Sequence, residues 1–246
     1  MMIFFYVFLI SFIATLVRST FGFGESLVAV PLFCLFVPID VAVPLSVLIS
    51  ILIALIVVVQ DHRQIHFNSA KWLILFALPG IPLGLLILVY GSEQWVKIGL
   101  GMVIILYSIY ALTGKNKITL KSDNKWWLFG CGFLSGILGG AYGLNGPPLV
   151  LYGNMRKWNA KDFRATLQAY FLPASFIGAI GFAVKGLITG TVLKCFLIAL
   201  PAAIPAIYIG RYLNHQLKDG TFFKYVYWGL IGTGVFLVIH SVYGLY

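Results

Sequence analysis

Long apolar runs separated by short polar segments make up this chain. The first run extends from Met1 to Val17 and the second from Leu27 to Val37. A helix needs about 20 apolar residues to cross a bilayer, so neither run makes a comfortable single crossing. The other runs lie near residues 41–60, 70–90, 96–112, 126–138, 147–153, 163–184, 187–210 and 222–245. The pattern predicts an all-α polytopic membrane protein.

The segment between the first two runs contains Arg18, followed by the turn Ser19-Thr20-Phe21-Gly22-Phe23-Gly24-Glu25-Ser26. A re-entrant hairpin explains both run lengths, because one helix enters, a glycine-rich tip turns at membrane depth, and a second helix returns. Irregular backbone at that depth is tolerated only where it lines a cavity. We therefore expect this first tip to line a cavity.

The same motif occurs twice along the chain. Phe21-Gly22 aligns with Tyr142-Gly143 at an offset of 121 residues, and the segment 79–84 aligns with 205–210 at an offset of 126. Slowly drifting offsets are typical of a diverged duplication. Each half then consists of a glycine-rich hairpin and three full spans. Chance similarity between apolar helices is the alternative.

Loop charges distinguish hairpins from interrupted crossings. If each broken element is a hairpin, thirteen Lys and Arg residues share one side and three share the other, whereas eight simple crossings divide them eight against eight. The positive-inside rule favours the hairpins and makes the rich side cytoplasmic, with eight crossings as the alternative. The rich side holds Arg63, Lys71, Lys115, Lys117, Lys121, Lys125, Arg156, Lys157, Lys161, Arg164, Arg211, Lys218 and Lys224, and the poor side holds Lys97, Lys185 and Lys194.

An odd number of full spans in each half gives the two halves opposite orientations. Within one transmembrane domain, 1–246, we expect a first repeat at 1–112, a cytoplasmic linker at 113–125 and a second repeat at 126–246. The first hairpin enters from outside, the second (126–153) from the cytoplasm, and both termini face outward. Inverted repeats whose broken helices meet near the midplane are the architecture of secondary transporters.

The second tip carries the features of an anion site. It reads Gly139-Gly140-Ala141-Tyr142-Gly143-Leu144-Asn145-Gly146-Pro147-Pro148. Glycine lets backbone approach a ligand closely, Asn145 is suited to cap the returning helix, and proline is favoured in a first turn. Helix starts expose N–H groups that favour anions. Two such starts beside Arg18 predict an anion site, and tight helix packing through the glycines is the alternative.

Arg18 is the most informative single residue. An arginine at the bilayer centre costs about 2.5–3.5 kcal/mol on insertion scales, so something must offset it. Glu25, the only acidic residue expected at depth, is its natural partner. The ion pair is either purely structural, or it opens when substrate displaces Glu25 or when a proton neutralises Glu25. A further alternative is that the Arg18 side chain extends to a membrane interface.

Other polar residues and prolines add weaker signals. Arg164 opens the span after the second hairpin, where it either sits among lipid headgroups or guards the inner mouth. Gln168 follows one turn later and is expected to line the path. Prolines expected to bend or break helices, partly at matching places in the two halves, are Pro79, Pro82, Pro173, Pro201 and Pro205.

Composition agrees with the membrane assignment. The 246 residues are 61% hydrophobic and 10% charged, whereas soluble domains are nearer a quarter charged. The net charge of +10 is then a topological signal and does not indicate nucleic-acid binding. The first run lacks a basic n-region and a small-residue cleavage site, so we expect it to be retained. The three cysteines lie in apolar runs without metal-ligand or redox spacing, and we expect them to be buried and inert.

Three motifs together resemble the sulfite exporter TauE/SafE family of membrane permeases. They are Phe21-Gly22-Phe23-Gly24 with Pro31-Leu32, Gly139-Gly140 with Gly143 and Gly146-Pro147-Pro148-Leu149, and Phe163-Arg164-Ala165-Thr166. The resemblance runs nearly end to end, although Glu25-Ser26 occupies part of a stretch where the family often has glycines. It implies transport of small sulfur-containing anions such as sulfite and organosulfonates across a prokaryotic plasma membrane.

We therefore predict a secondary transporter of a small anion that alternates access around a midplane site between two glycine-rich tips. The expected partners are the anionic substrate and the lipid bilayer, with proton coupling and a homodimer left open and no nucleic acid, cofactor or metal. The alternatives are a proton- or cation-linked carrier centred on Glu25 and, with no catalytic constellation to support it, a membrane-embedded enzyme. The expected substrate-binding residues are Arg18, Ser19, Thr20, Gly22, Gly24, Glu25, Tyr142, Gly143, Asn145, Gly146, Arg164 and Gln168.

Overall fold

The computed structural model describes residues 2–113 and 118–216 and scattered positions between 228 and 242. The described residues are helical and hold no strand, which confirms the all-α prediction. The expected last span, 222–245, falls largely outside them. The helices are α1 (Met2–Phe21), α2 (Glu25–Phe33), α3 (Ile39–Asp61), α4 (Phe67–Ala77), α5 (Gly80–Tyr90), α6 (Glu93–Thr113), α7 (Lys125–Tyr142), α8 (Gly146–Met155), α9 (Ala160–Val184) and α10 (Gly190–Gln216), with a short 3₁₀ turn, η1 (His62–Gln64), after α3.

Length and apolar composition mark the helices that cross the membrane. Within the described ranges, five helices are each long and apolar enough to cross a membrane, namely α1, α3, α6, α9 and α10. The helices α4 and α5 qualify as a pair, with a bend of 45° between them. The chain is therefore a multi-pass membrane protein. The bend lies at Pro79, as expected, but α10 runs unbroken through Pro201 and Pro205, so the matching prolines do not make matching breaks.

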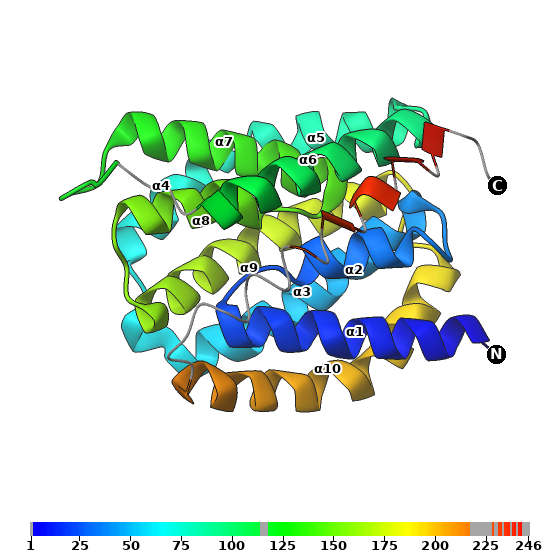
Figure 1. Ribbon diagram of the computed structural model, residues 1–246, viewed down its shortest axis with the longest axis horizontal. Coiled ribbons are helices and arrows are strands. Elements are labelled where there is room, and N and C mark those ends of the chain that lie inside the picture. The colour runs from blue at the N-terminus through cyan, green and yellow to red at the C-terminus, as the bar shows by residue number, and fades with distance from the viewer. Residues whose placement is uncertain are drawn as a thin grey trace.

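The chain reverses direction after α1. Helix α2 packs against α1 and runs back toward the end of the molecule where α1 begins (Figure 1). The connecting tip contains only Gly22, Phe23 and Gly24 outside helical structure. The returning helix begins at Glu25, within the expected start near Gly24-Glu25-Ser26, whereas the turn expected from Ser19 begins three residues too early. Helix α1 continues to Phe21 because the Gly22 N–H still bonds to the Arg18 carbonyl, at 2.6 Å. Gly22 and Gly24 then turn the chain with φ of +85° and +97°, which favour glycine.

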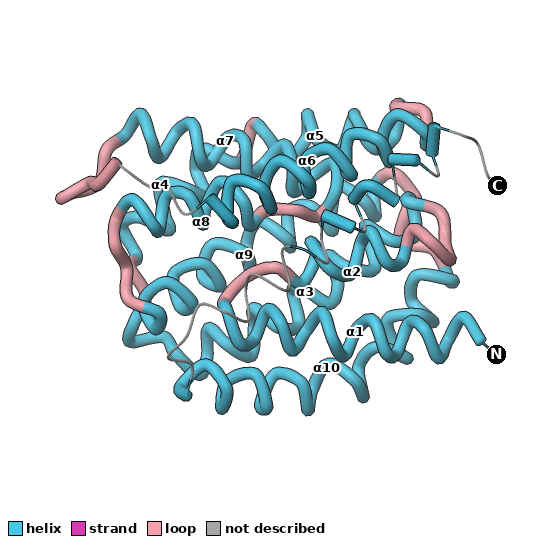
Figure 2. The backbone as a smooth tube through the Cα atoms, viewed as in Figure 1, coloured by secondary structure: helices cyan, strands magenta, loops and turns pink. Residues whose placement is uncertain are grey.

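A second reversal joins α7 to α8, which pack against each other (Figure 1). Helix α7 also ends at an aromatic residue followed by a left-handed glycine, Gly143, with φ +69°. The Gly143 N–H bonds to the Gly139 carbonyl at 3.0 Å, which is the same helix end as at Gly22. Figure 2 shows both tip loops midway along the long axis, whereas the loops that join the other helices lie mostly at its two ends.

Glycines on α7 bring it into close contact with the bent pair. A Cβ added to Gly136 would meet the Ala77 carbonyl oxygen, and one added to Gly140 would meet that of Ile81. On the facing helix, a Cβ on Gly84 would lie 2.9 Å from the Gly140 Cα. Small residues at helix contacts are the usual means of close packing in membranes. Tight packing therefore accounts for Gly140 of the second tip, as the alternative interpretation held.

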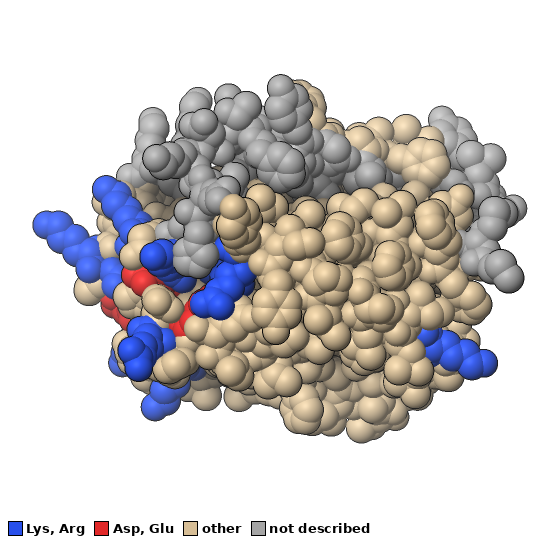
Figure 3. All heavy atoms as spheres, turned by 90° about the horizontal axis from the view of Figure 1, so that it is seen from below, with Lys and Arg blue, Asp and Glu red and all other residues tan. Residues whose placement is uncertain are grey.

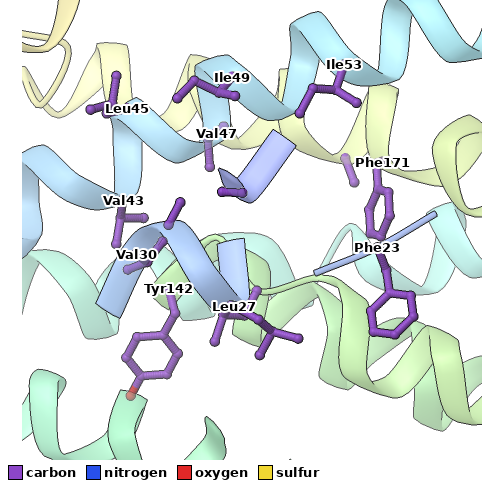
Figure 4. Close-up of a cluster of buried hydrophobic side chains, with 14 of the residues drawn as sticks. Phe23, Leu27, Val30, Val43, Leu45, Val47, Ile49, Ile53, Tyr142 and Phe171 are labelled. Carbon is purple, nitrogen blue, oxygen red and sulfur yellow. The ribbon is translucent and has the colours of Figure 1, made fainter. Parts of the chain in front are cut away.

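One part of the apolar core lies between the first hairpin and α3. Figure 4 shows Val30 of α2 beside Val43 of α3, with Leu27 of α2 and Val47 of α3 in the same cluster of buried side chains. All four are at most 2% exposed. This core holds α2, only nine residues long, inside the protein. It thereby fixes the position of the first tip within the bundle.

Lysine and arginine side chains collect at one end of the molecule. On the face shown in Figure 3 they lie at the end where α3 and α8 finish and α9 begins, and the opposite end carries few. Helix α1 begins at that opposite end (Figure 1). The prediction that the cation-rich end is cytoplasmic and the termini are external stays a prediction, with accessibility of residue 1 to labelling as its test.

Candidate functional site

Arg18 lies in the last turn of α1 with its side chain inside the protein, 3% exposed. Its Nη1 donates to Ser50 Oγ on α3 at 2.6 Å and lies 3.4 Å from Glu25 Oε2 at the start of α2. The guanidinium carbon stands 4.6 Å from the centre of the Phe171 ring, where a cation is attracted to the aromatic face. Helices α2, α3 and α9 therefore all contact this one charge.

The remaining edge of the guanidinium faces Gln168 on α9. Both Nε and Nη2 of Arg18 donate to Gln168 Oε1, at 3.2 and 2.8 Å. Gln168 is itself held by a bond from its Nε2 to the Gly22 carbonyl at 2.9 Å. Nε and Nη2 form the two-donor edge that matches carboxylates and other oxyanions. A neutral amide oxygen thus occupies the place where an oxyanion binds arginine best.

Glu25 is the first residue of α2 and is 1% exposed. Its Oε1 accepts from Ser46 Oγ at 2.8 Å and its Oε2 from Ser26 Oγ at 2.9 Å. Both distances are shorter than the 3.4 Å that separates Glu25 from Arg18. The ion pair expected from the sequence is present, but each partner makes shorter hydrogen bonds elsewhere. Arg18 and Glu25 can therefore separate without either losing all of its bonds.

A cavity opens beside this pair. Its free volume, counted as the space open to the centre of a water-sized sphere, is about 20 Å³. Its walls come from both tips and from α3 and α9, and Arg18 brings the only cationic side chain among them. The lining residues are Arg18, Gly24, Glu25, Ser26, Leu27, Ser50, Gly143, Leu144, Asn145, Gly146 and Phe171.

Most of the predicted site residues meet here. Arg18, Gly24, Glu25, Gly143, Asn145 and Gly146 line the cavity, and Gln168 bonds to Arg18. Gly22 stands just behind, where its carbonyl holds Gln168. The two tips, more than a hundred residues apart in sequence, therefore share one cavity.

Ser19, Thr20 and Tyr142 face other parts of the protein. A Cβ added to Gly210 on α10 would lie 2.5 Å from the Ser19 Cβ, so Ser19 packs against α10. Thr20 Oγ1 donates to the carbonyl of Leu16 in its own helix, at 2.7 Å. The Tyr142 ring points away from α3 (Figure 4), with its hydroxyl near Gly99 of α6. None of the three lines the cavity.

Asn145 stands directly before α8, with Pro147 and Pro148 in the first turn as expected. Its side chain, however, makes no capping hydrogen bond, so the predicted cap is wrong. The side-chain oxygen lies against Gly139, where an added Cβ would overlap it, and the backbone carbonyl accepts from Ser135 Oγ at 2.7 Å. Gly139 is therefore required to leave room for the Asn145 side chain.

Arg164 belongs to a different cluster. It is 2% exposed and its Nη1 donates to Asp61 Oδ2 at 2.8 Å, so it is buried in the protein and does not sit among lipid headgroups. Asp61 also pairs with Arg211 of α10, at 3.2 Å. Arg164, which the sequence predicted as a site residue, thus lies outside the cavity, one helical turn before Gln168 on α9.

The sequence analysis missed several residues of the site. Ser46 and Ser50 of α3, Ser26, Phe171 and Ser175 all contact the charged pair or its partners, Ser175 through a 3.0 Å bond to Ser50. Ser46 and Ser50 are four residues apart in an apolar span, which places both on one helix face. That spacing was an available signal, whereas nothing local marks Phe171.

A buried arginine beside irregular backbone in a bundle of membrane-spanning helices is the kind of site found in membrane transporters. The chain matches the family described as sulfite exporter TauE/SafE over residues 7–237, and it belongs to that family. The family consists of transporters, which agrees with the expectation that this chain is not an enzyme.

One relative is described as a probable sulfite/organosulfonate exporter TauE, from Cupriavidus necator (strain ATCC 17699 / DSM 428 / KCTC 22496 / NCIMB 10442 / H16 / Stanier 337). It is 25% identical over 168 residues, which are 67% of this chain and 65% of that protein, so the match spans less than two thirds of the relative. No solved structure matches the chain. All three cysteines are buried, as expected. Within the described residues, no group of His, Cys, Asp and Glu is arranged to hold a metal ion.

Proposed function

We propose that this protein is a secondary transporter of a small sulfur oxyanion of the sulfite or organosulfonate class. The anion binds in the cavity between the two tips, on the guanidinium of Arg18. The observation that carries the proposal is the geometry of that guanidinium, whose two-donor edge is occupied, among the described residues, only by the amide oxygen of Gln168. Family membership and the named relative support the substrate class.

Binding would proceed by exchange at Arg18. The incoming oxyanion takes Nε and Nη2 and displaces Gln168 Oε1, because a charged acceptor makes shorter and stronger bonds to a guanidinium than a neutral one. Ser50 and Phe171 stay in place and orient the guanidinium. Glu25 retains its bonds from Ser26 and Ser46, so the acidic side chain stays fixed while the anion enters.

Exchange at Gln168 links binding to movement of the tips. The Gln168 side chain bonds both Arg18 and the carbonyl of Gly22, so its displacement releases one contact between α9 and the first tip. We propose that the two halves then move around the bound anion to expose it to the opposite side. Proton coupling through Glu25, the inverted repeat and a homodimer stay predictions.

Binding of purified protein to candidate anions tests the proposal. Thermal-shift measurements with sulfite, sulfate, thiosulfate, taurine and sulfoacetate should show stabilisation by one or more of the sulfur oxyanions and none by matched chloride. Uptake of the stabilising anion into proteoliposomes then tests transport. Stabilisation by cations or by pH alone, with no response to any anion, would favour the carrier centred on Glu25 and contradict the proposal.

A further inference from the structure

A second cluster of charges lies at the cation-rich end of the bundle. Arg164 of α9 donates from Nη1 to Asp61 Oδ2 at 2.8 Å, and Nη2 of Arg211 on α10 lies 3.2 Å from Asp61 Oδ1. Both carboxylate oxygens of Asp61 are therefore engaged, one by each arginine. Two guanidinium groups share a single carboxylate, which leaves the cluster with one net positive charge.

The unused donors of this cluster are buried. Among the described residues, Nε and Nη2 of Arg164 have no hydrogen-bond partner although the residue is 2% exposed. Nε of Arg211 also has none. Buried donors in native proteins are almost always satisfied, so unpartnered ones call for an acceptor. The two free atoms of Arg164 are those that form its two-donor edge, the edge that in Arg18 faces Gln168.

The cluster adjoins the first tip. A Cβ added to Gly22 would lie 2.9 Å from the Arg164 Cα, so the backbone of the tip packs directly on Arg164. On α9, Arg164 and Gln168 are one turn apart and share a helix face. The Gly22 segment therefore lies next to both arginine clusters, in contact with Arg164 itself and with the glutamine that binds Arg18.

We propose that Arg164, with Arg211 beside it, forms a second binding site for the transported oxyanion at the cation-rich end of the protein. The oxyanion accepts from Nε and Nη2 of Arg164, and the net positive charge of the cluster favours it. The substrate class rests on the proposed function. Asp61 keeps the two guanidinium groups apart and fixed, so that the free edge is preformed for an anion.

Equilibrium binding of radiolabelled sulfite, kept under nitrogen, tests this site in the full-length purified protein. The wild type should bind sulfite at two saturable sites. Arg164→Gln should lose one of them and Arg18→Gln the other, and the double variant should bind none. Arg164→Lys keeps the charge beside Asp61 but lacks the fork, so it should weaken that site at least about tenfold.

Each other outcome separates the two proposals. A single site that survives Arg164→Gln and vanishes with Arg18→Gln overturns the second site and leaves the proposed function standing. A single site that vanishes only with Arg164→Gln overturns the role of Arg18 instead. No binding of sulfite in the wild type, together with no thermal response to any of the other sulfur anions, overturns both.

Arg63→Gln is the matched control, because Arg63 is exposed at the same end and its replacement removes the same charge. It should leave both sites unchanged. Loss of a site in Arg63→Gln equal to that in Arg164→Gln would mean that general attraction of anions, not the guanidinium edge, causes binding, and would overturn the proposal. Arg164→Lys covers the case in which Arg164→Gln fails to fold.

Discussion

Arg18 and Arg164 have nearly the same exposure, 3% and 2%, and each touches one carboxylate, but their surroundings differ. Around Arg18, serines hold the carboxylate and a glutamine fills the two-donor edge of the guanidinium. Around Arg164, the carboxylate is shared with a second arginine and the edge has no partner among the described residues.

Burial alone therefore does not identify how a protein uses an arginine. A neutral acceptor such as Gln168 satisfies the donors of Arg18 at rest, and in our proposal a charged acceptor displaces it, which suits a site that must close when empty. The open edge of Arg164 suits a site that anions reach first. Three of the predictions alter one side of this contrast at a time, and the fourth alters a third arginine–carboxylate pair for comparison.

The largest effect is expected from Arg18→Gln. Hydrogen bonds to charged groups contribute about 1.5–3 kcal/mol each, so loss of the two-donor edge should weaken sulfite binding at the cavity about 100-fold or more. Arg18→Lys should restore only part of the affinity, because an ammonium lacks the planar fork. Isothermal titration on both variants measures the change.

A purely structural role for Arg18 has a different signature. Arg18→Gln would then leave the Glu25 carboxylate alone in the interior, and expression and thermal stability would fall. The double variant with Glu25→Gln would recover stability. Unaltered sulfite affinity in a well-folded Arg18→Gln protein would remove Arg18 from the site.

The next effect is expected from Gln168→Glu. A carboxylate at this position would take the two-donor edge of Arg18 permanently and make it unavailable to an anion. Sulfite affinity at the cavity should fall by about tenfold or more, while Arg18 itself is unchanged. Gln168→Met, which leaves the edge free, is the control and should bind sulfite better than Gln168→Glu. Equal affinity of the two variants would show that the anion does not use this edge.

How well the sequence predicts these contacts depends on how far apart the contacting residues lie along the chain. The left-handed residues Gly22 and Gly143 were predictable, because tight turns favour glycine and both follow an aromatic residue in a repeated motif. The partnership of Arg18 with Glu25 was predictable too, since the two are seven residues apart on either side of one tip. These local features located the cavity.

Contacts across the bundle were not predictable in the same way. Asp61 bonds to Arg164 across 103 residues and to Arg211 across 150, and no periodicity in the sequence joins them. The helix ends were also misjudged, because α1 and α7 keep helical hydrogen bonds as far as the glycine that follows each. The prediction that prolines break helices is correct at Pro79, where one helix ends and the next begins. It is wrong at Pro201 and Pro205, which lie within one helix.

The third prediction concerns the other cluster and its stability. Asp61→Asn removes the one carboxylate between two guanidinium groups, and uncompensated buried charge is costly, about 3 kcal/mol or more. We expect a lower unfolding temperature in chloride-free buffer and a larger stabilisation by added sulfite than in the wild type, because the anion replaces the lost charge. Thermal scans with and without sulfite measure both. A variant that sulfite stabilises no more than the wild type would contradict an anion site at Arg164.

The smallest effect is expected at a third arginine–carboxylate pair, Asp123 with Arg156, which is partly exposed to solvent. Nε of Arg156 lies 3.2 Å from Asp123 Oδ1, although not at a hydrogen-bonding angle. The carboxylate also accepts from Tyr152 at 2.7 Å, from Ser69 at 2.9 Å and from Asn68 at 3.0 Å. Burial by itself would raise the pKa of Asp123, but these hydrogen bonds and Arg156 lower it below its ordinary value of 3.8.

Because the folded protein lowers this pKa, the ionised carboxylate stabilises the fold above pH 3.8, and the contribution is lost as the pH falls through the lowered value. Asp123→Asn should therefore lower the unfolding temperature at pH 7 by about 2–4 °C, since a partly exposed pair contributes little. The difference from the wild type should persist down to pH 4 and shrink below it. Thermal scans across this range measure the difference, with Lys121→Gln as a control that should match the wild type throughout. If the difference between Asp123→Asn and the wild type disappeared already at pH 5 to 6, a group other than Asp123 would be responsible. Because the proposed sulfite sites lie at Arg18 and Arg164, sulfite binding should be the same in all three proteins.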